Sequence, residues 1–148
     1  MQSQSFTPPQ GAFTRSVLVR FSHCDPAGIV YFPRYFDMFN SLIEDWYAEE
    51  LKQDLASLIK QELVTPFVHI ECDFKLPSRM GDVIELTLLV ERLGRSSLGV
   101  AAVCHRDGVE RLRARMTTAM ISTVTGKPSA MPEALRSAIE SYQQRTSG

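Results

Sequence analysis

Two different spacings of hydrophobic positions divide the chain between one long helix and a set of strands. From about residue 33 to residue 51, bulky apolar side chains recur every three or four positions, which predicts a helix with a wide apolar stripe. Pro33 suits the first turn of this helix, because its missing N–H would have no acceptor there. A helix this apolar is normally wrapped by other structure. The stripe comprises Tyr35, Phe36, Phe39, Leu42, Ile43, Trp46, Tyr47 and Leu51.

An alternation of apolar and polar positions predicts strands before and after the helix. Asp107 and Gly108 form a strong hairpin signal between the last two of them. Short helices are predicted near residues 54–61 and 132–142, and the ends, 1–11 and 143–148, are expected to be loose. The predicted strands lie at about 13–21, 68–76, 84–90, 98–104 and 112–120.

The later strands are the only part of the chain that can cover the apolar helix. An antiparallel sheet that curves around one central helix is the hotdog architecture, so the sequence predicts an α+β hotdog fold. The 148 residues are the size of one domain. We expect a single domain over residues 1–148, with an ordered core of about 12–142. Such a sheet leaves an edge and apolar surface uncovered, which predicts pairing with a second copy.

Composition narrows the class of protein. A net charge of −1 argues against a dedicated nucleic-acid binder. Cys24, Cys72 and Cys104 are too few and too widely spaced for a disulfide framework, and we interpret them as reduced thiols. Residues 1–10 lack the features of a signal peptide, and no apolar run approaches the roughly 20 residues that span a bilayer. A cytoplasmic protein without membrane contact is expected.

The loop Ser22–Pro33 is the most informative segment. It leads into the predicted helix, and free N–H groups at a helix N-terminus stabilise developing negative charge. Asp25 is therefore suited to a reaction that forms an oxyanion. The alternative is structural, because Asp25 and Gly28 are also residues that form turns. A metal site is not expected: His23, Cys24 and Asp25 are adjacent and converge poorly on one ion, and no paired Cys or His spacing occurs elsewhere.

The segment from Asp25 to Tyr35, with Val19-Arg20-Phe21 before it, resembles the active-site signature of the 4-hydroxybenzoyl-CoA thioesterase family. It reads Asp-Pro-Ala-Gly-Ile-Val-Tyr-Phe-Pro-Arg-Tyr, and the resemblance extends over about residues 13–124, strand order included. The resemblance implies an acyl-CoA thioesterase that needs no cofactor. It also implies a dimer of dimers, although the residues themselves do not separate a homodimer from a homotetramer.

Three catalytic roles are carried over by position in this resemblance. Asp25 matches the catalytic carboxylate, acting as nucleophile or as general base on water. The backbone N–H of Phe32 matches the group that polarises the thioester carbonyl. Gly28 would let the backbone turn close to the substrate.

The same resemblance indicates the binding residues for the acyl group. Tyr35 and Asn40 match the acyl pocket, and Tyr31 belongs to a crowd of aromatic residues that favours an aromatic acyl group. Asn40 stands where the family member specific for 4-hydroxybenzoyl has an aspartate, so the acyl group stays open and a short aliphatic one is an alternative. Each aromatic residue, taken singly, is also an ordinary core residue.

Arg95, Ser96 and Ser97 match the region where the family contacts the phosphates of CoA, with fewer basic residues. The same stretch, with the preceding glycine, is also a good hairpin turn. Arg111 and its neighbours Arg113 and Arg115 alternate along a strand, which is typical of a solvated sheet face.

Other interpretations remain open at this point. Other hotdog thioesterases use a carboxylate on the central helix, so Glu44 or Asp45 is an alternative base. A non-catalytic module for acyl-CoA or acyl-carrier protein would bind without turnover. A hotdog dehydratase is disfavoured, because the three histidines form no motif with an acid.

Overall fold

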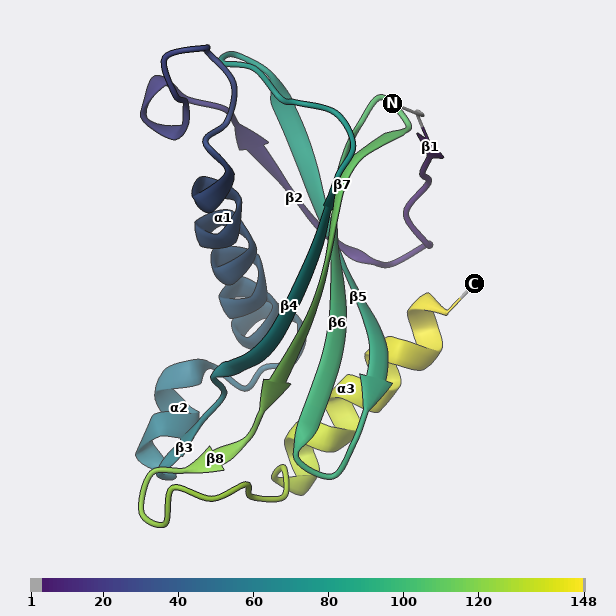
Figure 1. Cartoon of the computed structure of the whole chain (residues 1–148). Helices are drawn as coiled ribbons and strands as arrows, with labels where there is room; N and C mark the ends of the chain where they lie inside the picture. Colours follow the sequence, from purple (N-terminus) through teal and green to yellow (C-terminus); the bar gives the residue numbers. More distant parts are fainter. Residues whose placement is uncertain (1–3, 148) are drawn as a thin grey trace.

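The computed structural model describes residues 4–147, and its elements follow the order that the hydrophobic pattern predicts (Figure 1). The helices are α1 (Phe32–Asp45), α2 (Leu55–Lys60) and α3 (Glu133–Thr146), with a 3-10 turn at Phe21–His23 and a π-helical stretch at Trp46–Glu50. The strands are β1 (Gln4–Ser5), β2 (Phe13–Leu18), β3 (Leu63–Val64), β4 (Phe67–Phe74), β5 (Val83–Leu93), β6 (Ser97–Arg106), β7 (Val109–Ala119) and β8 (Ile121–Ser122).

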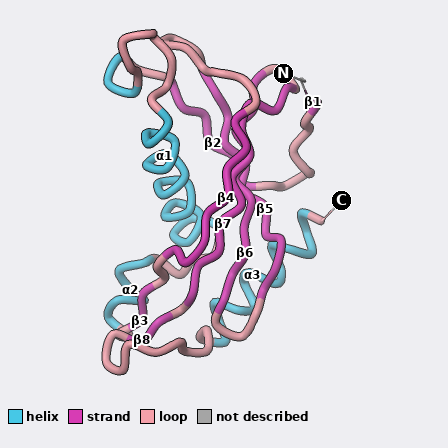
Figure 2. Tube along the Cα trace, in the orientation of Figure 1, coloured by secondary structure: helices cyan, strands magenta, loops and turns pink. Residues whose placement is uncertain are grey.

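One antiparallel sheet carries the fold. Its order is β2-β5-β6-β7, and β7 is paired on its other side first by β4 and then by β1. Figure 2 shows these strands as a twisted layer with α1 along one side. The predicted α+β hotdog fold is confirmed. No helix among residues 4–147 is long and apolar enough to cross a membrane.

The core lies between α1 and the sheet. Because side chains alternate along a strand, β5 turns every second residue toward the helix, and Ile84 and Leu86 are at most 1% exposed. Phe39 on α1 is 1% exposed, and Trp46 just beyond α1 is fully buried. The apolar stripe that predicted the helix is thus the surface that the sheet covers.

The ends of the chain contain more structure than predicted. Gln4–Ser5 pairs with β7, and the Phe6 ring lies 4.8 Å from that of His105. At the other end, α3 continues to Thr146, which is buried. The elements therefore extend beyond the predicted core of about residues 12–142, because each end meets a partner on the sheet. The predicted loose ends at residues 1–3 and 148 lie outside the described residues.

The arginines of β7 do not form one solvated face. Arg113 pairs with Glu110, which is fully buried, and Arg115 pairs with Glu91. A bulge between β6 and β7 interrupts the alternation near Arg111, whose guanidinium donates instead to the carbonyl of Pro77. Sequence alternation alone gives no sign of such a bulge.

Tyr142 on α3 connects this helix to the sheet. Its fully buried hydroxyl accepts a hydrogen bond from the Phe13 N–H at 2.8 Å and donates to the Leu88 carbonyl. Phe13 and Leu88 are a cross-strand pair of β2 and β5, so one side chain holds α3 against both strands.

Tyr142→Phe is expected to lower the free energy of unfolding by about 1–3 kcal/mol, because it leaves a buried N–H without its acceptor. Urea unfolding of wild type and variant measures the difference. Tyr31→Phe is the matched control: Tyr31 is 50% exposed, and its loss should change stability by less than about 0.5 kcal/mol. Equal losses in the two variants would contradict the role given to Tyr142.

Candidate active site

The segment before α1 folds as a small hairpin with Asp25 at its turn. Cys24 and Val30 form an antiparallel bridge, and the Asp25 N–H donates to the Ile29 carbonyl at 3.0 Å. The Gly28 N–H donates back to the Asp25 carbonyl at 2.9 Å. These backbone bonds hold the position of Asp25 relative to the start of the helix.

The Asp25 carboxylate has a structural role. Its Oδ1 accepts the Ala27 N–H at 2.9 Å, which is the Asx turn that sequence reasoning gave as the alternative to catalysis. The two roles are compatible, because the turn engages only one oxygen. Within residues 4–147, Oδ2 has no hydrogen-bond partner, and the side chain is half-buried against a cavity. The turn orients the carboxylate and leaves one oxygen available.

Gly28 is required by its backbone conformation. Its φ is +77°, a left-handed value that residues with a Cβ rarely adopt. A Cβ built at this position would meet no atom of the chain within 4 Å. The positive φ explains why the turn needs glycine at position 28. The close approach of the Gly28 backbone to the substrate stays a prediction.

The β4–β5 loop holds this hairpin from the other side. The Val30 N–H donates to the Ser78 carbonyl at 2.9 Å, and the Met80 N–H donates to the Gly28 carbonyl at 3.1 Å. Ile29 and Arg79 form a further antiparallel bridge. The candidate catalytic loop is thus part of a small backbone-paired structure built from two segments.

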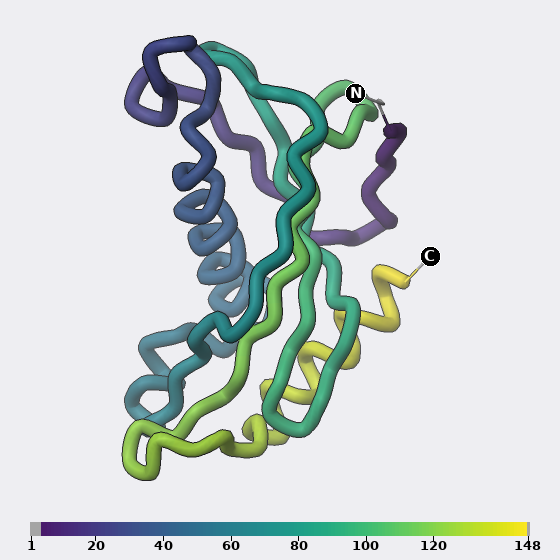
Figure 3. The backbone as a smooth tube through the Cα atoms, in the orientation of Figure 1, coloured from purple at the N-terminus to yellow at the C-terminus, as the bar shows by residue number. Residues whose placement is uncertain are grey.

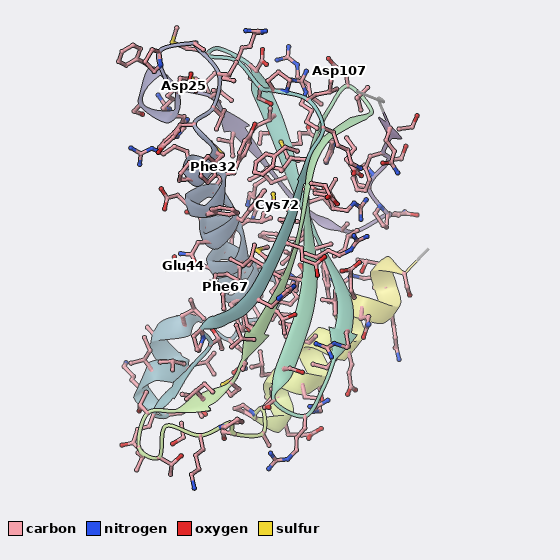
Figure 4. The ribbon with its side chains drawn as sticks, in the orientation of Figure 1. Asp25, Phe32, Glu44, Phe67, Cys72 and Asp107 are labelled. Atoms are coloured by element: carbon pink, nitrogen blue, oxygen red, sulfur yellow. The ribbon has the colours of Figure 1, made fainter. Side chains whose placement is uncertain are left out.

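Phe32 is the first residue of α1, and its N–H has no acceptor among the described residues. Pro33, next to it, has no N–H to offer. Figure 4 shows Asp25 on the loop above the start of the helix, where Phe32 lies. Both residues line one cavity of about 530 Å³. A carboxylate and a helix N-terminus at one cavity can attack a carbonyl group and stabilise the resulting oxyanion.

Aromatic side chains form much of the cavity wall. Tyr35 is buried, with 4% of its surface exposed, whereas Tyr31 and Phe32 are 50% and 55% exposed. Phe74, at the end of β4, lies 6.4 Å from Phe32 and 6.3 Å from Tyr35, measured between ring centroids. Sequence reasoning missed Phe74 as a lining residue. The alternation of β4 marked it as a strand residue but gave no sign of which helix end it would meet.

Asn40 does not line the cavity of its own chain. It is exposed on α1, eight residues beyond Phe32, which corresponds to about 12 Å along the helix. Phe32, Phe36 and Asn40 lie at intervals of four and so share one stripe of the helix. The predicted acyl-pocket role of Asn40 is not met within a single chain.

The predicted CoA-binding residues lie at the far end of the sheet. Arg95 and Ser96 form the turn between β5 and β6, which Figure 3 shows at the opposite end of the molecule from the loop before α1. With 11 residues, β5 spans roughly 35 Å between these two ends. Arg136 of α3 donates to the Gly94 and Arg95 carbonyls, at 2.6 and 3.1 Å. Neither this turn nor Ser97 contacts the cavity of its own chain.

The alternative bases on the central helix are also distant from the cavity. Glu44 lies twelve residues beyond Phe32, about 18 Å along the helix axis, and is exposed (Figure 4). Asp45 lines a separate groove of about 510 Å³ between α1 and β2. Of the three candidate carboxylates, only Asp25 borders the aromatic cavity within one chain.

Gly28→Ala is expected to destabilise the protein by about 1–2 kcal/mol through its left-handed backbone and to lower turnover of thioesters by about tenfold to a hundredfold. Turnover should fall because the strained turn moves the Asp25 carboxylate. Gly126→Ala is the matched control, since Gly126 has φ +72° and also has no atom within 4 Å of an added Cβ. Calorimetry and thiol release should show similar stability losses and loss of turnover only at position 28. Equal turnover in both variants would show that the turn at Gly28 does not contribute to catalysis.

Comparison with known proteins identifies the family of this chain. The profile of the thioesterase-like superfamily matches residues 19–139. A 1,4-dihydroxy-2-naphthoyl-CoA hydrolase of Synechococcus elongatus is 27% identical over 121 residues, covering 80% of this chain and 88% of that protein.

Solved structures show the same fold. A 1,4-dihydroxy-2-naphthoyl-CoA thioesterase from Synechocystis superposes with a TM-score of 0.80 at 24% identity, over 87% of this chain and 96% of the other. A Staphylococcus aureus protein solved in complex with CoA superposes with a TM-score of 0.88 at 16% identity, over 98% and 91%. The resemblance to the 4-hydroxybenzoyl-CoA thioesterases is thereby confirmed at the level of the superfamily. The chain belongs to the thioesterase-like superfamily and is a hotdog-fold thioester hydrolase.

Proposed function

We propose that this enzyme hydrolyses an acyl-CoA with an aromatic acyl group, and that Asp25 supplies the catalytic carboxylate. The observation that carries the proposal is that Asp25 and the N-terminus of α1 border one cavity with aromatic walls. The resemblance of the segment from Asp25 to Tyr35 supports a close relationship to the 4-hydroxybenzoyl-CoA thioesterases. Relatives named for 1,4-dihydroxy-2-naphthoyl-CoA support an aromatic CoA thioester as the substrate class.

The chemistry follows from the two groups at the cavity. The free Asp25 oxygen either attacks the thioester carbonyl carbon or takes a proton from a water that attacks it. Negative charge then develops on the carbonyl oxygen, and the Phe32 N–H at the helix N-terminus stabilises it. Collapse of the adduct breaks the C–S bond and releases the CoA thiolate. On the covalent route, water then hydrolyses the acyl–Asp25 anhydride.

Asp25→Asn is expected to lower kcat for benzoyl-CoA and hydroxybenzoyl-CoA by about a hundredfold or more. The amide oxygen can still accept the Ala27 N–H, so the turn survives, but the amide can neither attack nor deprotonate water. Thiol release measures the effect. Glu44→Gln and Asp45→Asn are the matched controls and should retain turnover.

Three other results would change the assignment. Loss of turnover in Glu44→Gln or Asp45→Asn, with Asp25→Asn active, would move the base to the helix. Turnover confined to aliphatic acyl-CoA would reject the aromatic substrate. Saturable binding of acyl-CoA without release of thiol by the wild type would indicate a binding module.

We further propose that the working enzyme is at least a homodimer in which two copies complete each site. The free edge of β4 presents exposed apolar side chains, among them Val68, Ile70 and Phe74, which favours pairing with a second copy. An antiparallel pairing of two β4 strands brings the Asp25 end of one copy toward the Arg95 end of the other. The partner's Arg95, Ser96 and Ser97 are then available to the CoA phosphates, and pairing of such dimers would give the tetramer.

Mixed dimers test this arrangement directly. Asp25→Asn and Arg95→Glu chains, each deficient alone, should regain about a quarter of wild-type kcat/KM when they pair at random. In a mixed dimer, one site contains both defects and the other contains none. If each site used Asp25 and Arg95 of the same chain, every site would stay defective and mixing would restore nothing.

A further inference from the structure

The β4–β5 loop, residues 75–82, has little apolar packing of its own, and only Ser78 among its residues is buried. Backbone bonds fix its two ends. The Arg111 carbonyl accepts the N–H groups of the first two loop residues, and the carbonyl of the last residue, Asp82, accepts the Val19 N–H at 2.8 Å. The middle of the loop depends on polar contacts instead, because it has few apolar ones to hold it.

The guanidinium of Arg111, on β7, holds this middle part. Figure 4 shows Asp107, in the hairpin that leads into β7, at the same end of the molecule as Asp25. The Arg111 Nη1 donates to the Pro77 carbonyl at 2.9 Å and to the Ser78 Oγ at 3.4 Å. The bond to Pro77 is charge-assisted and ends on a backbone carbonyl, so it fixes the path of the chain as well as a side chain.

Asp82 holds the same stretch from the end of the loop. Its Oδ2 accepts the Arg79 N–H at 3.0 Å and lies 3.6 Å from the Arg111 Nη1. Its Oδ1 lies 2.7 Å from the Nη1 of Arg106, on β6. An isolated surface ion pair contributes little, but this carboxylate joins two guanidiniums to the backbone of the loop. We call Arg111 and Asp82 the clamp, because together they bind three successive residues, 77–79.

The residues that the clamp binds are also residues that hold the Asp25 hairpin. The Ser78 carbonyl accepts the Val30 N–H at 2.9 Å, and Arg79 forms an antiparallel bridge with Ile29. The Ile29 carbonyl in turn accepts the Asp25 N–H at 3.0 Å. A short path of backbone contacts therefore leads from the clamp to the candidate catalytic residue.

We propose that Arg111 and Asp82 are positioning residues for the Asp25 carboxylate and act through residues 77–79. Neither residue lines the aromatic cavity, so neither touches a substrate bound there. Loss of the clamp lets the loop, and the hairpin paired with it, shift relative to the Phe32 N–H at the start of α1. Misplacing a reacting group by about 1 Å can cost about a hundredfold in rate. The inference rests on the proposed function, because it concerns the carboxylate assigned there.

Arg111→Met removes the donor and keeps much of the length of the side chain. It should lower kcat for benzoyl-CoA about tenfold or more and change KM less than about threefold, because the aromatic walls on α1 and β4 stay in place. Arg113→Met is the matched control. Arg113 lies on the same strand with its side chain 19% exposed, against 20% for Arg111, and pairs with Glu110 instead of the loop. Its kcat should stay within about twofold of wild type.

Two variants of Asp82 separate its hydrogen bond from its charge. Asp82→Ala loses both, and should lower kcat about as much as Arg111→Met. Asp82→Asn keeps an oxygen that can accept the Arg79 N–H, and should retain a larger share of kcat. Wild-type kcat in Asp82→Ala would overturn the role given to Asp82.

A double variant separates positioning from a general loss of structure. Residues that act through one group are not additive, so Arg111→Met should lower turnover little further in the Asp25→Asn background. A merely structural loss would lower turnover by the same factor in both backgrounds. Amide hydrogen exchange gives a readout without chemistry: the Val30 N–H should exchange about tenfold faster in Arg111→Met and at the wild-type rate in Arg113→Met.

The outcomes distinguish this inference from the proposed function. Equal losses of kcat in Arg111→Met and Arg113→Met, a full further loss in the Asp25→Asn background, or unchanged exchange of the Val30 amide would each overturn the clamp. Loss of turnover in Asp25→Asn with wild-type turnover in Arg111→Met would retain the proposed function and reject the clamp alone. Unaltered turnover in Asp25→Asn would reject the proposed role of Asp25 and, with it, the positioning role of Arg111.

Discussion

The apolar face of α1 has to be covered by strands of the same chain, and its bulk determines how the sheet is built. Phe39, Leu42 and Trp46 are each at most 2% exposed, and burying side chains of this size contributes about 1.5–3 kcal/mol apiece. The strands that do this are long enough to run past the helix at both ends. Removing that cover would expose this apolar face of the helix to water.

The packing of α1 against the sheet determines where the N-terminus of α1 lies, and with it the position of the site. A wrapped helix exposes its ends at the ends of the sheet, so the loop before α1 meets the loop between β4 and β5. Backbone hydrogen bonds join the two loops, among them the bond from Val30 to Ser78. Ser78 is itself fully buried, and its Oγ accepts a hydrogen bond from Arg111 at 3.4 Å, so the segment that positions the Asp25 turn is tied to β7 as well. Changes in the β4–β5 loop are therefore expected to move the Asp25 turn.

The sequence resemblance assigns two groups of residues, one around Asp25 and one around Arg95, to a single substrate. These two groups lie at opposite ends of one sheet. The turn containing Arg95 belongs to the end where α3 packs, and the turn containing Asp25 belongs to the other. A sheet with a free apolar edge at β4 offers a physical way to bring them together, since two antiparallel copies exchange ends. Stability and catalysis would then depend on the same surface, because pairing covers the edge and completes the site.

From the sequence, short-range periodicity predicted the main helices and strands and the hotdog fold, and the resemblance of the segment from Asp25 to Tyr35 indicated the superfamily. Local chemistry gave the turn at Asp25 as one of two alternatives. The spacing of apolar positions predicted that Phe39 and Ile84 are buried. The Asp107-Gly108 pair predicted a hairpin turn, and the two residues have φ of +52° and +75° in the structure. Only the tertiary structure decided that Phe74 walls the cavity, that Asn40 and Arg95 lie away from it, and that Arg111 leaves the solvated face of its strand to hold Ser78. These are contacts between segments far apart in the chain, and they depend on strand pairing, a bulge and the helix end that each strand reaches, none of which is encoded in the spacing of neighbouring residues.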